Sequence, residues 1–98
     1  MGRKSSYLEQ MDKFIGRKIY FLRLAKGLSR AELSKVIDVT YQQLQKYENG
    51  TNRVSASRLL LIAKALEHET PYFYEGFERS HNRGARYCKK VASLNKSN

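Results

Sequence analysis

Two helix-start signals in the middle of the chain limit the possible folds more than any other feature. Ser29 is followed three residues later by Glu32, which is the spacing of a capping box at a helix N-terminus. Thr40 occupies the same kind of position before the next helical pattern. The helix that starts at Ser29 therefore has to end before Thr40, with a break at residues 37–39. The pattern predicts two short helices joined by a tight turn.

Each of these two helices has its own set of buried side chains. In the first, Leu33 and Val36 are predicted to point inward. The second is expected over residues 41–48, ending at Asn49-Gly50, which is a typical stop signal. Only Leu44 and Tyr47 of the second helix are predicted to enter the core, so most of its surface is left polar.

Further helical patterns flank this pair. A first helix is predicted over residues 13–25, ended by Gly27. Three of its apolar side chains share one face: Ile15, Ile19 and Leu22. A fourth helix is capped by Ser55, and its apolar stripe recurs at i, i+3, i+4 and i+7: Leu59, Ile62, Ala63 and Leu66. Thr70 as cap and Pro71 as first residue predict a short fifth helix that ends near Gly76. The fold class expected is all-α, with five helices.

The chain divides into three zones by composition. Residues 1–12 form a polar N-terminal leader, residues 13–77 hold nearly all the apolar periodicity, and residues 78–98 form a basic tail. No apolar run approaches the roughly 18 residues of a membrane span, and no secretory signal precedes the domain. Cys88 is the single cysteine, so no internal disulfide can form and a cytoplasmic location is expected.

The charge of the chain favours a polyanionic partner. Nineteen Lys and Arg against nine Asp and Glu give a formal net charge of +10. On the second helix of the pair, one face carries Tyr41, Gln42, Gln45 and Lys46, with no carboxylate among them. Amide side chains can bond an adenine edge in pairs, and lysine can donate to guanine or to a phosphate. Double-stranded DNA is therefore the expected partner.

Residues 14–77 strongly resemble the XRE family, the phage repressor and Cro type of helix-turn-helix domain. The segments that carry the resemblance are Gly27-Leu28-Ser29, Ala31-Glu32-Leu33, Val39-Thr40, Tyr47-Glu48-Asn49-Gly50 and Ile62-Ala63-Lys64-Ala65-Leu66. Two departures accompany it. The turn usually carries glycine where this chain has Asp38, and Tyr41 is bulkier than the glutamine of many phage repressors. Base preference therefore cannot be copied from a relative.

The resemblance implies which residues contact DNA. Tyr41 and Gln42 open the recognition helix and would approach base edges, with Gln45 and Lys46 one turn later. The expected DNA-binding set also includes residues at the helix start, in the following loop and at the start of the fourth helix: Arg30, Thr40, Asn52, Arg53, Ser57 and Arg58. The resemblance further implies a structural ion pair between Arg23 and Glu48.

A homodimeric regulator that represses from a palindromic operator is the function expected. One short recognition helix reads few base pairs, and two-fold symmetry doubles the site. The aromatic cluster formed by Tyr72, Phe73, Tyr74 and Phe77 either supplies a dimer contact or closes the core, with Phe73 inward and the others outward. The alternatives are a weakly specific architectural DNA-binding protein and an antitoxin-like module that binds a protein through the tail. No catalytic motif is present, so neither an enzyme nor a cofactor or metal is expected.

Overall fold

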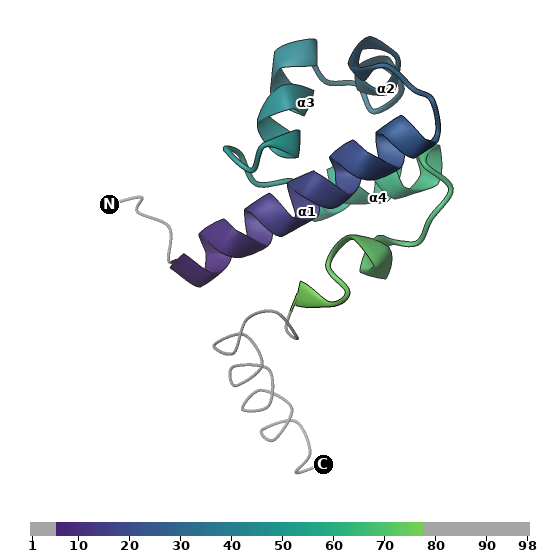
Figure 1. The fold of residues 1–98 in the computed structure, drawn as a ribbon. Helices are drawn as coiled ribbons and strands as arrows, with labels where there is room; N and C mark the ends of the chain where they lie inside the picture. Colours follow the sequence, from purple (N-terminus) through teal and green to yellow (C-terminus); the bar gives the residue numbers. More distant parts are fainter. Residues whose placement is uncertain (1–5, 78–98) are drawn as a thin grey trace.

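The computed structural model describes residues 6–77, in which the regular secondary structure is helical and no strand occurs (Figure 1). The elements are α1 (Ser6–Ala25), α2 (Arg30–Val36), α3 (Tyr41–Glu48), α4 (Ala56–Ala65) and a 3-10 turn, η1 (Thr70–Phe73). The long helix α1 packs against α3 and η1, while α2 packs against both α3 and α4. The predicted all-α fold is confirmed. The basic tail, residues 78–98, lies outside the described residues.

The caps of α2, α3 and α4 are the residues predicted from the sequence, Ser29, Thr40 and Ser55. Ser29 Oγ accepts from Glu32 N (3.0 Å), and Glu32 Oε1 accepts from Ser29 N (2.8 Å), which completes the capping box. The hydrogen bond from the Ser29 backbone N–H, and then one with the Ser29 side chain, hold the pKa of the Glu32 carboxyl below its usual value. Their stabilising contribution is therefore present at neutral pH and is lost as the pH falls through that lowered pKa. Thr40 and Ser55 cap α3 and α4 through one side-chain bond each, in which the hydroxyl accepts from the backbone N–H three residues later.

The core lies between α1, α2, α3, α4 and η1. Its fully buried side chains come from all five elements and the residues that follow them: Ile19, Leu33, Ile37, Leu44, Ile62, Leu66, Phe73 and Phe77. The prediction that Val36 points inward was wrong, since its side chain is 63% exposed and Ile37 is buried instead. Ile37 lies just past the end of α2, where the chain turns back toward the core.

Helix α1 begins at Ser6, seven residues earlier than predicted. Residues 6–12 are mostly polar, but the side chain of Tyr7 packs against Phe77 at the other end of the described chain. The Tyr7 and Phe77 ring centroids are 5.3 Å apart, and those of Phe14 and Phe77 are 5.4 Å apart. Residues 6–12, assigned from the sequence to a polar leader, are therefore continuous with the first helix. The extra turns are stabilised by contacts distant in sequence.

The predicted fifth helix is a 3-10 turn that ends at Phe73, and Thr70 is its first residue rather than its cap. Glu69 occupies the cap position and makes no side-chain capping bond. Gly76 has a φ of +88°, which turns the chain so that Phe77 returns to the core. The aromatic cluster is therefore split: Phe73 is buried as expected, Phe77 is also buried, and Tyr74 remains exposed.

Helices α1 and α3 approach each other closely at Gly16. A Cβ on this residue would lie 2.6 Å from the Glu48 carbonyl oxygen and nearer still to that of Tyr47. A second close approach occurs at Gly50, where a Cβ would lie 2.7 Å from Lys13 Cα. At each glycine the added Cβ would meet backbone atoms of the other element, so no side-chain rotation can make room. The position of α3 on α1 is consequently fixed by two glycines.

Replacing Asp38 by glycine is expected to stabilise the fold by about 0.5–1 kcal/mol. Asp38 adopts a left-handed φ of 60°, which costs an L-residue about 1–2 kcal/mol. Glycine removes this strain, but its greater freedom in the unfolded chain offsets part of the stabilisation. The measurement is the urea midpoint at constant m-value. As control, Gly27 (φ 73°) has open space around its Cβ position, so Gly27→Ala should lose about 1 kcal/mol through backbone strain alone. Destabilisation by Asp38→Gly would contradict this account.

Candidate nucleic-acid interface

The recognition-type helix α3 has one buried face and one exposed face. Leu44, Tyr47 and Glu48 are buried, which confirms the prediction for Leu44 and Tyr47. The residues predicted to face a ligand are all exposed: Tyr41, Gln42, Gln45 and Lys46. The exposed face therefore presents a phenol, two amides and an ammonium, and the one carboxylate of the helix lies on the other side.

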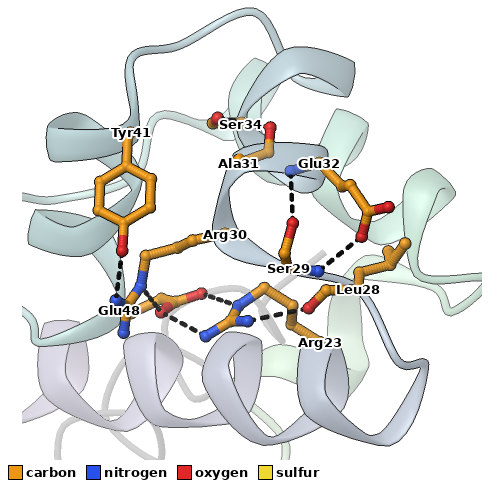
Figure 2. A network of polar contacts seen from close by, with 9 residues as sticks. All are labelled: Arg23, Leu28, Ser29, Arg30, Ala31, Glu32, Ser34, Tyr41 and Glu48. Carbon is orange, nitrogen blue, oxygen red and sulfur yellow. Dashed lines mark hydrogen bonds and ion pairs between the residues drawn. The ribbon is translucent and has the colours of Figure 1, made fainter.

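The carboxylate of Glu48 joins α3 to the two preceding helices (Figure 2). Arg23 on α1 donates from Nε to Oε2 (2.6 Å) and from Nη2 to Oε1 (3.2 Å). Arg30 on α2 donates from Nε to Oε1 (2.8 Å). Arg23 also donates from Nη1 to the Leu28 carbonyl oxygen (2.9 Å), in the loop between α1 and α2. The ion pair that the resemblance implied is present, and Arg30 extends it.

Arg30 also contacts the first residue of α3. Its Nη1 donates to the Tyr41 hydroxyl (3.3 Å), and its guanidinium carbon lies 5.7 Å from the centre of the Tyr41 ring. The hydrogen bond with Glu48, and then that with Tyr41, raise the pKa of Arg30. The resemblance implied a phosphate contact for Arg30. Here its Nε is bonded to Glu48, and its Nη1 is bonded to the Tyr41 hydroxyl (Figure 2).

The loop that follows α3 is tied back to α1. Arg53 donates from Nε to both oxygens of Asp12 (3.3 and 3.4 Å), and the Arg53 side chain is still 52% exposed. Asn49 Oδ1 accepts from the Thr51 backbone N–H (3.2 Å) and the Thr51 hydroxyl (2.6 Å), which shapes the turn. Asp12 had been assigned to a polar leader, so its bond with Arg53 was not predicted.

Three other residues of the expected DNA-binding set have structural partners. Arg58 Nη1 donates to the Ile37 carbonyl oxygen (2.5 Å) and so links α4 to the turn before α3. Thr40 Oγ1 accepts from Gln43 N (3.0 Å), and Ser57 Oγ lies 3.4 Å from Ser55 Oγ. Asn52 is half-buried in the loop. Phosphate contacts by these residues stay a prediction.

Among residues 6–77, no three His, Cys, Asp or Glu side chains gather where a metal ion could be held. No helix over the same range has the length and apolar character needed to cross a bilayer.

Two short helices joined by a tight turn, the second with a polar exposed face, define a helix-turn-helix protein. The chain belongs to the XRE type of the helix-turn-helix family of transcriptional regulators, as the sequence had indicated. A family model described as helix-turn-helix matches residues 19–73. This match covers α2, the turn and α3 together with most of the core around them.

Named relatives and solved structures agree with this assignment. Uncharacterized HTH-type transcriptional regulators of Rickettsia conorii and Rickettsia prowazekii are each 53% identical over 98 residues, which cover 94% of this chain and 78% and 75% of theirs. The clp gene regulator ClgR from Corynebacterium glutamicum has a TM-score of 0.65 at 19% identity, covering 86% of this chain and 87% of its own. The SinR/SinI complex has a TM-score of 0.61 at 21% identity, covering 85% of this chain and 80% of its own. At these identities the two structures support the fold alone.

Proposed function

We propose that the protein represses transcription by binding a palindromic DNA operator as a homodimer, with α3 of each subunit in the major groove. The observation that carries the proposal is the exposed face of α3, which is rich in amides and lacks any carboxylate. This face is presented on a helix that is held rigidly by Glu48 and by the close contact with α1. Rigid presentation allows side chains to meet base edges in a fixed register.

The exposed residues of α3 have the chemistry needed for direct base readout. Gln42 and Gln45 can each bond an adenine edge through paired amide contacts, and Lys46 can donate to guanine. Tyr41 is positioned by Arg30 and can pack on a thymine methyl group or a sugar. Sequence preference should therefore centre on the bases nearest Gln42.

Phosphate contacts would come from the residues around α3. Arg53 is the best placed of these, because half of its side chain is exposed even while it is paired with Asp12. The other expected phosphate contacts are Arg30, Thr40 at the N-terminus of α3, Asn52, Ser57 and Arg58. Such contacts fix register and affinity and carry no base information.

A dimer is favoured by the small size of the reading surface. Helix α3 has only eight residues, and a single short helix covers few base pairs, whereas two-fold symmetry doubles the site. Large apolar side chains remain exposed away from α3, including Leu60 and Leu61 on α4 and Tyr74 after η1. Burial of such side chains between two subunits would stabilise the dimer.

The test is selection of bound duplexes from a random DNA pool at near-physiological salt. A palindrome with half-sites about one helical turn apart is the expected result. Bound DNA without an enriched motif would instead indicate an architectural protein that binds the phosphate backbone by electrostatic attraction. An absence of binding would overturn the proposal and favour a protein partner, for which residues 78–98 are the first segment to examine.

The variant Gln42→Ala is expected to lose preference at one base position in each half-site. Loss of a paired amide contact should reduce discrimination there by about 1–3 kcal/mol, while other positions are unchanged. The matched control is Gln43→Ala, because Gln43 is the adjacent glutamine on α3 but is half-buried. Repeating the selection with both variants makes the comparison. An unchanged motif with Gln42→Ala would show that α3 does not read bases through this residue.

A further inference from the structure

A groove lies beside the C-terminal end of α3, where α1 passes beneath it. Its volume is about 290 Å³, and its walls are Lys13, Arg17, Tyr20, Phe21, Glu48 and Asn49. Lys13 and Arg17 are one turn apart on α1, so both side chains lie on the same side of that helix. Both are exposed, whereas Tyr20 is half-buried. Two cations therefore border a groove formed partly by aromatic rings.

This groove adjoins the elements expected to meet DNA. Asn49 caps the C-terminus of α3 and lies one turn beyond Lys46. Lys13 is held against the same turn, because its backbone is within contact distance of the Gly50 position. The residue before Lys13 is Asp12, which binds Arg53 of the loop. Lys13 therefore lies between the end of the recognition helix and the loop after it.

The charge around the groove is positive. Within residues 6–77, neither Lys13 nor Arg17 forms a salt bridge with a carboxylate. Glu48 is the one acid in the groove wall, and both of its oxygens already accept from Arg23 and Arg30. Glu9, one turn before Lys13, is exposed and makes no ion pair with it. An anion in this groove would meet two uncompensated cations and the amide of Asn49.

We propose that Lys13 and Arg17 bind two adjacent phosphates of the DNA backbone, next to the phosphates contacted by the loop after α3. This inference rests on the proposed function and extends it from the helix-turn-helix unit to α1. Their Cβ atoms are about 5–6 Å apart, and their long flexible side chains can each extend to a separate phosphate of one strand. The long α1 thereby adds a backbone contact that is independent of base sequence.

The test compares the salt dependence of DNA binding by two charge-matched double variants. Lys13→Gln/Arg17→Gln is expected to lower the slope of log K against log salt by about 1.8, since each neutralised phosphate contributes about 0.9. Lys26→Gln/Lys64→Gln removes the same charge from the ends of α1 and α4, where Lys26 pairs with Glu67. This control should leave the slope nearly unchanged. Selected motifs should be the same for both variants.

A second measurement locates the contact on the DNA. Single neutral methylphosphonate linkages are scanned through the operator with the wild-type protein and with Lys13→Gln/Arg17→Gln. Two adjacent linkages should weaken the wild-type protein and have no further effect on the variant. Equal sensitivity of both proteins at every linkage would overturn the phosphate site while leaving sequence-specific binding intact. If the wild-type protein binds no DNA, the proposed function itself fails.

Discussion

Gly16→Ala is expected to lower the free energy of unfolding by at least about 3 kcal/mol, the upper end for overpacked sites. On most helix surfaces the same change stabilises by about 1 kcal/mol, because alanine is the better helix former. Here the added methyl group would lie 2.6 Å from the Glu48 carbonyl oxygen and closer to that of Tyr47. Helices α1 and α3 would have to separate, so DNA binding should weaken together with stability.

Urea unfolding monitored by circular dichroism measures the effect of this change. The reference is Gly27→Ala, in which the new methyl group meets no atom within 4 Å. Gly16→Ala should be the more destabilised of the two variants by about 2 kcal/mol, the difference between overpacking and backbone strain alone. A neutral or stabilising result at Gly16 would mean that the two helices are free to move apart.

Glu48→Ala is expected to destabilise the domain by about 3–5 kcal/mol, because a buried charge is left without its partner. The side chain of Arg23 is only 6% exposed and would keep a single hydrogen bond, to the Leu28 carbonyl oxygen. A domain of this size is stable by only about 5–15 kcal/mol, so a large unfolded fraction is expected. The measurement is thermal and urea denaturation.

Two further variants separate the buried charge from simple loss of packing. Arg23→Met/Glu48→Leu replaces the pair with apolar side chains of similar volume and should be less destabilised than Glu48→Ala alone. Arg30→Ala leaves Glu48 paired with Arg23 and removes a side chain that is 24% exposed, so its effect on stability should be smaller. A loss below about 1 kcal/mol for Glu48→Ala would place the pair in the range of surface ion pairs.

Local signals made much of the fold predictable from the sequence. The caps Ser29, Thr40 and Ser55 are set by hydrogen bonds within three residues, so short patterns identify them. The stripe from Leu59 to Leu66 likewise follows from helical periodicity. Asp38 stands where the family usually carries glycine, and it adopts a left-handed φ of 60°.

Features that depend on distant contacts were missed. The N-terminal turns of α1 are polar in sequence, and the ring contact between Tyr7 and Phe77, seventy residues apart, does not appear in any local pattern. Val36 fits the inward spacing of α2, but the turn after the helix buries Ile37 instead. The last helix was predicted from Thr70-Pro71, but it is a 3-10 turn that ends at Phe73, and the chain turns again at Gly76 (φ 88°) before Phe77.

The candidate site was predictable to the same extent. Periodicity was sufficient to separate the exposed face of α3 from the buried one. The partners of the surrounding arginines were not predictable, because each joins elements far apart in sequence: Arg30 with Glu48, Arg53 with Asp12 and Arg58 with Ile37. Lys13 and Arg17 were missed for the same reason, since only the packing of α1 on α3 brings them beside the recognition helix.

The division of α3 into two faces also bears on how such a protein can change its target during evolution. Gln42, Gln45 and Lys46 are exposed and take no part in the Glu48 network, and exposed positions of this kind usually tolerate substitution within about 0.5 kcal/mol. Substitutions at these three positions could therefore change the operator that is recognised without destabilising the fold. Tyr41 is different, because its hydroxyl is bonded to Arg30. Its replacement would also disturb a neighbouring helix, which makes it the slowest of the four to diverge.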